Sequence, residues 1–348
     1  MRSRCVPSLF VLTIVVALTS SVLGQPSTSG VRAGNGKAAR PRAVFRTTWG
    51  HPDLQGTWAN QTITPLERPT EFYGKEFLTA EEAAALEQKT AERGDADRRD
   101  QVGSDADVSR AYNDFWWDRA TKVLVTRRTS LIVDPPDGRI PSLTAEAQER
   151  AKVEALRPAV RHMSTGGRGT DSWLDRGLWE RCIIYAPLPR LPRSYNPNLQ
   201  IFQTPGLVVI SYEMIHEVRI IPLDGRPHLG ENLRQWLGDS RGHWDGDTLV
   251  VDTTNFSDKT NFRGSAETLH LVERYRRIDE DTLLYEFTVD DPTTWTRPWT
   301  AQIPMPKSSG QIYEYACHEG NSGLPGILAG ARFEEKAAAD EAAKKGAR

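Results

Sequence analysis

A run of short alternating segments separated by tight turns fills the second half of the chain and sets its fold class. The turns are marked by Pro205-Gly206, Asp224-Gly225, Asp245-Gly246-Asp247 and Asp279-Glu280-Asp281. Strands at this spacing, joined by short turns, are typical of antiparallel sheets and barrels. The expected strands cover residues 199–204, 207–213, 216–222, 248–254, 268–277, 282–290, 299–305 and 311–317. We therefore predict a mainly β protein, built as an up-and-down antiparallel barrel or a strongly curved sheet that could hold one small ligand.

Helical patterns precede these strands. Thr79 followed by Glu82 gives the capping-box pattern, which predicts a helix that ends near Arg93. A second helix is expected at about 144–156, because Pro158 stops it. An α-helical and irregular N-terminal segment should therefore wrap the β-region. The predicted organisation is a signal peptide at 1–24, a flexible leader at 25–45, one β-rich domain at 46–328 (wrap at 46–165, main β-region at 166–328), and a charged helical or disordered tail at 329–348.

The start of the chain is typical of a secretory signal peptide. A positive start at Arg2 and Arg4 leads into an apolar stretch, and Val22 and Gly24 fit a cleavage site before Gln25. The apolar stretch is shorter than the roughly 20 residues that span a bilayer, which favours cleavage over membrane anchoring. We expect a periplasmic or secreted protein that keeps no membrane attachment after cleavage.

The charge balance argues against one class of partner. The chain carries 44 basic and 46 acidic residues, and cleavage removes two of the basic ones. An acidic balance of this kind argues against nucleic acid or an anionic membrane surface as a partner. The expected partner is a small-molecule ligand or substrate, and the oligomeric state stays open.

Cleavage would also remove Cys5 and leave two cysteines, Cys182 and Cys317. In an oxidising compartment an even pair indicates one disulfide. The bridge would close a loop of roughly 135 residues around the whole β-region. The alternative is a pair of buried thiols.

Two resemblances accompany these patterns. Gly56-Thr57-Trp58 ahead of a series of strands resembles the Gly-x-Trp opening of lipocalin-like (calycin) barrels. The chain also resembles a family of exported bacterial proteins of unassigned role, over most of its length after the signal peptide. That likeness rests on residues 134–141, 238–251 and 290–299, which include Asp-Pro-Pro-Asp-Gly, Gly-His-Trp-Asp-Gly-Asp and Pro-Thr-Thr-Trp. The second resemblance implies an exported bacterial domain and implies no activity.

The seven histidines show no metal-binding pattern. The chain has no His-x-His, no His-Glu-x-x-His and no paired-cysteine motif. His270 and Glu273 stand three positions apart, which puts them on opposite faces of a strand. We predict no organic cofactor and no metal, with one alternative left open: a metal site assembled from distant strands.

Four ionisable side chains in or beside the expected strands are candidates for acid/base catalysis: His216, His270, Glu286 and His318. Strand alternation places His270, Glu286 and His318 on polar faces. His216 lies among aliphatic side chains if residues 210–218 form one strand, or at a rim if residues 214–216 form a turn. A polar face either meets solvent or lines a barrel cavity. In a cavity, contact between a carboxylate and an imidazole can tune a general base near neutral pH.

Four further side chains are candidates for substrate binding: Tyr212, Trp295, Arg297 and Glu314. Tyr212 shares a face with His216 if residues 210–218 form one strand. Trp295 and Arg297 lie in a proline-bracketed loop, where arginine beside tryptophan suits recognition of a carboxylate or a sugar. The loop is either the mouth of a ligand cavity or a well-packed strand connection.

These candidates support three functions. The first is cofactor-independent acid/base catalysis on a small organic molecule, of the lyase, isomerase or hydratase type. The second is a non-catalytic periplasmic binding protein for a small ligand. The third is a carbohydrate-active hydrolase with a carboxylate pair, in which Glu286 acts with Glu314 or with Asp290.

Overall fold

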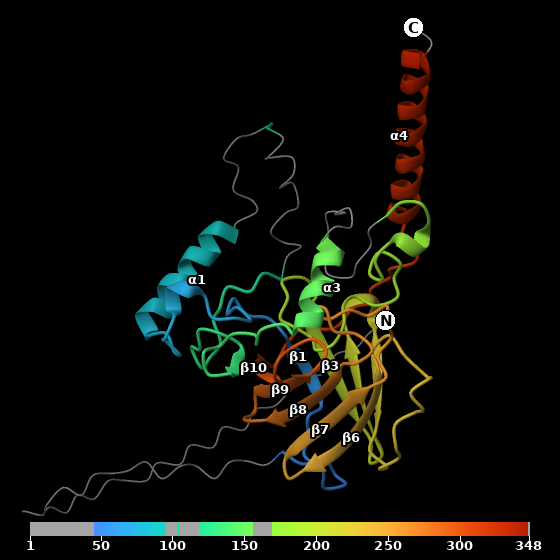
Figure 1. Ribbon diagram of the computed structural model, residues 1–348. Helices are drawn as coiled ribbons and strands as arrows, with labels where there is room; N and C mark the ends of the chain where they lie inside the picture. The colour runs from blue at the N-terminus through green and yellow to red at the C-terminus, as the bar shows by residue number, and fades with distance from the viewer. Residues whose placement is uncertain (1–44, 95–102, 105–117, 156–168, 347–348) are drawn as a thin grey trace, which may run out of the picture. The chain divides into compact units, whose positions relative to one another are not determined.

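The computed structural model describes residues 45–94, 103–104, 118–155 and 169–346. Within these ranges the chain forms ten strands and three α-helices (Figure 1). The mainly β class predicted from the turn pattern is confirmed. The expected signal peptide, and the expected leader up to residue 44, lie outside the described residues.

The first sheet has four antiparallel strands in the order β1-β3-β4-β5. Three of them follow one another along the chain and pair as neighbours. The fourth, β1, comes from the N-terminal half and pairs with β3. The strands are β1 (Gly56–Ala59), β3 (Asn198–Gln203), β4 (Leu207–Tyr212) and β5 (Val218–Pro222).

The second sheet has six antiparallel strands in the order β2-β10-β9-β8-β7-β6. Five of them form a meander, and β2 adds to the edge of β10 from the N-terminal half. The turn between β6 and β7 contains Gly246 at a φ of 58°, which glycine adopts without steric cost. The strands are β2 (Ile132–Asp134), β6 (Asp239–Asp245), β7 (Thr248–Thr254), β8 (His270–Arg277), β9 (Thr282–Asp290) and β10 (Trp299–Pro306).

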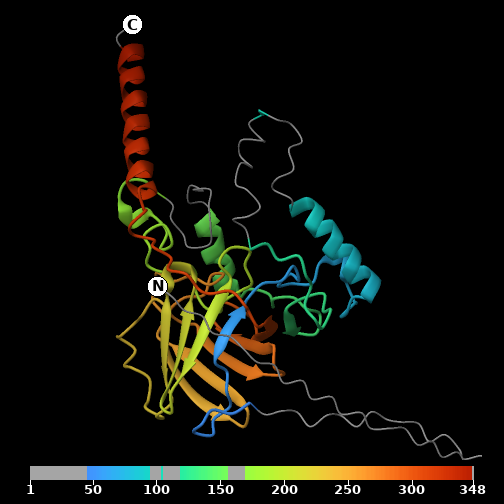
Figure 2. The ribbon, with the colours of Figure 1, turned by 180° about the vertical axis from the view of Figure 1, so that it is seen from behind.

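The two sheets face each other (Figures 1 and 2), and their inner faces share one hydrophobic core. The alternation predicted for β8 and β9 is confirmed, because every second side chain of both strands is buried. Burying one large apolar side chain contributes about 1.5–3 kcal/mol, so such a core dominates the stability of the fold. Its largest fully buried side chains are Trp58, Trp299, Tyr275, Tyr285, Phe256 and Phe287.

The two sheets come close at two corners without forming a continuous ladder. At one corner β5 runs beside β6, and a Cβ added to Gly242 would lie 2.7 Å from the Leu223 side chain. Only glycine therefore permits this approach without a shift. At the other corner a single bridge joins Trp58 to Lys307. The described strands thus form two facing sheets, and the predicted closed barrel is not found among them.

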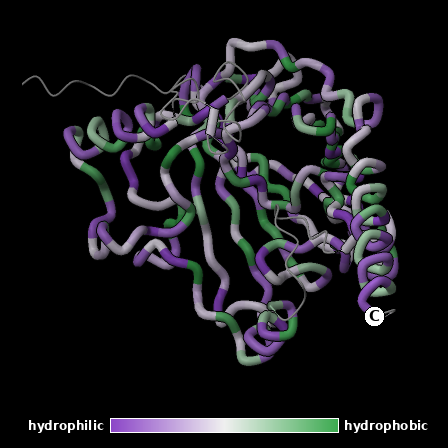
Figure 3. Tube along the Cα trace, turned by 90° about the horizontal axis from the view of Figure 1, so that it is seen from above, coloured by the Kyte–Doolittle hydropathy of each residue, from purple (hydrophilic) through white to green (hydrophobic). Residues whose placement is uncertain are grey.

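Three helices lie outside the sheets: α1 (Ala80–Gly94), α3 (Ala145–Ala155) and α4 (Gly323–Gly346). The capping box of α1 is confirmed. Thr79 Oγ1 accepts from the Glu82 backbone at 3.2 Å, and Glu82 Oε2 accepts from the Thr79 backbone at 2.8 Å. The tail is helical and begins earlier than expected, at Gly323. None of its residues is buried, and Figure 3 shows it as a mixture of purple and pale green.

Two parts of the strand prediction are wrong. Residues 311–317 form no strand, because β2 already pairs with the edge of β10 that such a strand would need. Residues 239–245 form β6, which the alternation pattern missed. Its sequence is polar on both faces, and it is a strand because it pairs with β7 along its whole length.

The predicted disulfide between Cys182 and Cys317 is present, with Cα atoms 5.8 Å apart. The two cysteines are 135 positions apart in the chain. The loop that they close contains β3 to β10 and leaves out, among the described strands, only β1 and β2.

Candidate functional site

The structure separates the four predicted acid/base residues. His216 ends a short 3-10 turn before β5 and is exposed, and its Nδ1 lies 2.9 Å from the backbone oxygen of Tyr315. His318 is exposed beyond the disulfide. His270 and Glu286 stand on neighbouring strands, on the outward face of the second sheet. The four do not converge, because the polar faces of β8 and β9 point away from the core.

The carboxylates considered for sugar hydrolysis have other partners or meet solvent. Oε2 of Glu286 accepts from Gln302 Nε2 at 2.6 Å, and Oε1 lies 3.8 Å from Arg274 Nε. Glu314 is exposed and belongs to no strand. Asp290 pairs in register with His270 on the neighbouring strand. No carboxylate pair in an open cleft is formed by these residues.

The proline-bracketed loop before β10 is a packed strand connection. Trp295 is only 2% exposed, and its ring lies edge-on to that of Trp299 at 5.9 Å. Arg297 pairs at the surface with Asp134 at 2.7 Å. Asp291 fixes the loop through hydroxyl donors from Ser265, Thr268, Thr293 and Thr294. The Trp295 ring is therefore not available for stacking on a ligand.

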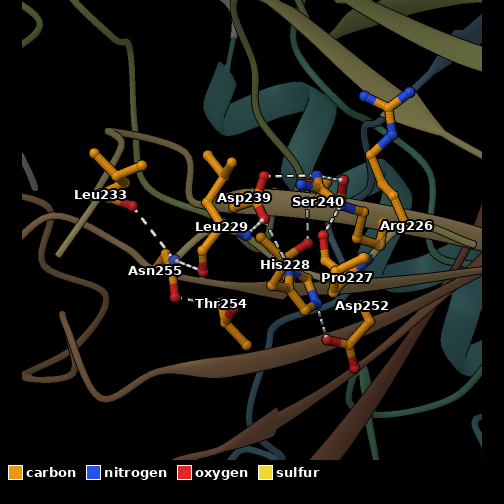
Figure 4. Close-up of polar contacts among 12 residues, drawn as sticks. Arg226, Pro227, His228, Leu229, Leu233, Asp239, Ser240, Asp252, Thr254 and Asn255 are labelled. Atoms are coloured by element: carbon orange, nitrogen blue, oxygen red, sulfur yellow. Dashed lines mark hydrogen bonds and ion pairs between the residues drawn. The ribbon is translucent and has the colours of Figure 1, made fainter. Parts of the chain in front are cut away.

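A row of alternating carboxylates and imidazoles crosses the outer face of the second sheet. His228 bridges two carboxylates, with Nδ1 at 2.9 Å from Asp239 Oδ2 and Nε2 at 2.8 Å from Asp252 Oδ1 (Figure 4). The other oxygen of Asp252, Oδ2, lies 2.7 Å from Nε2 of His270. We name these four residues the carboxylate–imidazole chain.

Strand order brings three of the four together. Asp239, Asp252 and His270 stand on the adjacent strands β6, β7 and β8. Asp239 pairs with Thr254 across the ladder, so Asp239 and Asp252 share one face, two residues apart. His270 follows on β8, one diagonal step from Asp252. Side chains at this separation reach one another across antiparallel strands.

His228 comes from the long connection between β5 and β6. Two backbone contacts hold this connection against β6 (Figure 4). Leu229 N donates to Asp239 Oδ2 at 2.9 Å, and Arg241 Nε donates to the oxygen of Pro227 at 3.0 Å. His228 stands between these two anchors, so its ring is held over β6 and β7.

The hydrogen bond between Asp252 and His270 shifts the pKa of both groups. The hydrogen bond from His270 holds the pKa of Asp252 below its usual range, against the opposite effect of burial. The bond to Asp252 likewise holds the pKa of His270 above its usual 6.5, against burial and with help from the charge of Asp290.

His270 is the accessible end of the carboxylate–imidazole chain. Its side chain is 42% exposed. Asp252 takes Nε2, and no group in the described part of the chain bonds Nδ1. Neutral His270 therefore donates its Nε2–H to Asp252 and keeps the Nδ1 lone pair open. This is the arrangement of a general base oriented by a carboxylate.

A cleft of about 740 Å³ opens between the beginnings of β5 and β6. Its polar lining includes Glu217, Arg219, Asp239, Ser240 and Lys259. We name it the edge cleft. Asp239 belongs both to the edge cleft and to the carboxylate–imidazole chain. The volume is in the range that accommodates a small organic molecule.

A buried ion pair reaches inward from the edge cleft and joins the two sheets. Arg219 of β5 donates to Glu273 of β8 from Nη1 at 3.1 Å and from Nη2 at 2.6 Å. The hydroxyls of Tyr275 and Tyr285 donate to Glu273 Oε1 at 3.0 and 2.8 Å. Burial, followed by the charge of Glu273, raises the pKa of both tyrosines well above 10. Tyr212, predicted to bind substrate, is buried beside this pair, 3.4 Å from Arg219 Nη1.

Sequence patterns single out His270 and miss its partners. Asp252 occupies an outward position of the predicted strand 248–254, so a comparison of outward carboxylates on neighbouring strands would find it. Asp239 lies on β6, which was not predicted. His228 sits in a long connection, and no local pattern tells where that connection runs.

No group of three or more histidine, cysteine, aspartate or glutamate side chains within the described ranges could hold a metal ion. The helices formed by the same residues include none that is long and apolar enough to cross a membrane. A scan against protein-family models and a search of curated proteins both found no match to the chain. The candidate site is therefore interpreted from its own geometry.

The bond between Asp252 and His270 should stabilise the fold only within a limited pH range. Because the pKa of Asp252 is lowered in the fold, its carboxylate stabilises the folded state above about pH 3.8. This contribution is lost as pH falls through the folded-state pKa of Asp252. The raised His270 pKa stabilises below pH 6.5, and this is lost as pH rises through its folded-state value. His270→Gln should therefore cost most near about pH 5, by less than about 1 kcal/mol because the pair is half exposed.

Urea unfolding of the unmodified protein and of His270→Gln, each near about pH 5 and about pH 9, measures this difference in the free energy of unfolding. His243→Gln is the matched control. His243 is an exposed histidine of β6, on the same outward face of the second sheet as His270. An equal loss for His270→Gln at both pH values would contradict the expected dependence.

Proposed function

We propose that this chain is an exported small-molecule enzyme that performs cofactor-independent acid/base chemistry of the lyase, isomerase or hydratase type, with His270 as its general base. The observation that carries the proposal is the position of Asp252 between two imidazoles, 2.7 Å from His270 and 2.8 Å from His228. The hydrogen bond to Asp252 fixes one tautomer of His270 and raises the pKa of His270. A base with a pKa near the working pH is the most effective in proton transfer.

Each member of the carboxylate–imidazole chain then has a defined role. Nδ1 of neutral His270 takes a proton from the substrate and returns it to the product or to water. Asp252 stabilises the imidazolium that forms. His228, held between Asp239 and Asp252, is a positioning residue that keeps the Asp252 carboxylate in place. The edge cleft, which Asp239 also lines, would hold the organic part of a substrate.

Kemp elimination of 5-nitrobenzisoxazole tests the proposal, because this reaction needs only an accessible base that removes one proton. The rate should rise with pH around a midpoint above 6.5, the ordinary value for histidine. His270→Gln should lower the rate at least about 10-fold. Asp252→Asn should move the midpoint to lower pH, because the carboxylate no longer stabilises the imidazolium.

His243→Gln again serves as the control and should leave the rate and its pH midpoint unchanged. It removes an exposed histidine from the same sheet face, outside the carboxylate–imidazole chain. Equal rates for the unmodified protein and His270→Gln would rule out His270 as the base.

The edge cleft supports a second candidate function, the non-catalytic binding of a small ligand. Its volume of about 740 Å³ suits such a ligand whether or not proton transfer follows. Native mass spectrometry of the protein purified from its own host tests this. A retained small molecule together with no Kemp activity would favour binding over catalysis. We do not propose sugar hydrolysis, because Trp295 is buried and Glu286 bonds Gln302.

Export to the periplasm or the medium belongs to the same proposal. The disulfide between Cys182 and Cys317 supports it, since structural disulfides persist in oxidising compartments. The resemblance to exported bacterial proteins of unassigned role is in keeping with this location.

A further inference from the structure

A second cavity, formed by other parts of the chain, is lined by two arginines. It has a volume of about 450 Å³ and lies between the end of α1 and residues 62–63, 119–121 and 192–194. Arg119 and Arg193 line it. No described aspartate or glutamate does so. We name it the arginine cavity.

Arg193 is half-buried, and no carboxylate among the described residues forms an ion pair with it. Its guanidinium lies 3.9 Å from the ring centroid of Tyr185. Burial, together with repulsion from Arg190, lowers the pKa of Arg193 to about 9. A cation withdrawn from water without a partner destabilises a fold. A bound anion would remove that cost.

Glu217, a buried carboxylate that lines a small cavity together with Arg193, already bonds other groups. Glu217 forms an ion pair with Arg190 and accepts the backbone N–H of Tyr185. Arg190 itself lies over the ring of Tyr212, at 4.6 Å from its centroid. Glu217 therefore neutralises Arg190 and leaves the charge of Arg193 uncompensated.

Hydroxyl groups complete the lining of the arginine cavity. Thr62 and Thr90 donate to backbone oxygens outside it. The hydroxyls of Thr121 and Ser194 line the cavity and form no hydrogen bond with the described residues. Guanidinium forks with hydroxyl donors form the set that binds the oxygens of carboxylate and phosphate groups.

We propose that the arginine cavity binds a small organic anion through a carboxylate or phosphate group, with Arg193 and Arg119 as its cationic ligands. Arg193 makes the central contact, and Thr121 and Ser194 supply hydroxyl donors. A cavity of about 450 Å³ also has room for the organic part of such a molecule. The inference does not rest on the acid/base function, since none of these residues belongs to the carboxylate–imidazole chain.

Isothermal titration calorimetry with two probes tests the proposal and separates the two anion types. Inorganic phosphate and succinate are each titrated into the full chain at constant ionic strength. At least one should bind saturably. Arg193→Gln should weaken that binding at least about 10-fold, because it removes a charge-assisted hydrogen-bond donor. Arg193→Lys should weaken it less, because it keeps the charge and loses only the planar fork.

Arg46→Gln is the matched control, because Arg46 is an exposed arginine paired with Asp247. It should bind both probes as the unmodified protein does. Thermal unfolding adds a second measurement, in which the anion should raise the midpoint more for the unmodified protein than for Arg193→Gln. The comparison is needed because phosphate stabilises folded proteins in general.

Arg119→Gln covers the case in which Arg193→Gln does not fold, and it too should weaken binding. The proposal is overturned if neither probe binds saturably. It is also overturned if Arg193→Gln, or Arg119→Gln in its place, binds both probes as tightly as the unmodified protein.

Discussion

Replacing Glu273 by glutamine should lower the free energy of unfolding by about 3–5 kcal/mol. Glu273 is fully buried, and its carboxylate binds both terminal nitrogens of Arg219, whose side chain is 3% exposed. Glutamine keeps the shape and removes the negative charge. The Arg219 cation is then left buried without a counter-charge. Urea unfolding near neutral pH measures the loss.

Two controls show whether burial is the cause. Asp247→Asn breaks the ion pair with Arg46, whose partners are nearly half exposed, and should cost less than about 1 kcal/mol. Arg219→Leu combined with Glu273→Leu should cost less than Glu273→Gln alone, because it leaves no charge in the core. A loss for Glu273→Gln no larger than that for Asp247→Asn would show that the pair is not a stabilising contact between the sheets.

Removing the disulfide should lower the free energy of unfolding by about 4–5 kcal/mol. The bridge between Cys182 and Cys317 spans 135 positions, so in the unfolded chain it suppresses a very large number of conformations. The double variant Cys182→Ser, Cys317→Ser gains that freedom when it unfolds. Urea unfolding under oxidising conditions compares the two proteins.

Reduction of the unmodified protein is the matching experiment and should reproduce the loss seen in the double variant. The Kemp rate should remain, because neither cysteine contacts the carboxylate–imidazole chain. A change in the free energy of unfolding below about 1 kcal/mol would mean that positions 182 and 317 stay close together in the unfolded chain without the bridge.

Local patterns predicted local structure well. Thr79 and Glu82 marked the start of α1, and alternation assigned the faces of β8 and β9. The pattern failed where pairing depends on distant strands. Residues 311–317 alternate like a strand, but the edge of β10 is taken by β2. β6 is polar on both faces, and its neighbour β7 makes it a strand. The arrangement of strands as two sheets also depends on such long-range contacts.

The candidate site shows the same contrast between local patterns, which the sequence predicts, and long-range contacts, which it does not. Alternation places His270 and Glu273 on opposite faces of one strand, as observed. The sequence could not tell that Glu273 meets Arg219, because β5 and β8 belong to different sheets. Nor could it tell that His228 reaches β6 and β7, because a connection without regular structure has no period from which a direction follows. The partners of an ionisable group are a property of the assembled fold.

The pairing of β1 and β2 has a consequence for synthesis and folding. Both strands come from the N-terminal half, and their partners β3 and β10 lie far later in the chain. They leave the ribosome long before those partners are made, so they must stay unpaired in the meantime. Until they pair, the edges of β3 and β10 are open to strands of other molecules. Protection against aggregation is therefore complete only when nearly the whole chain has been made.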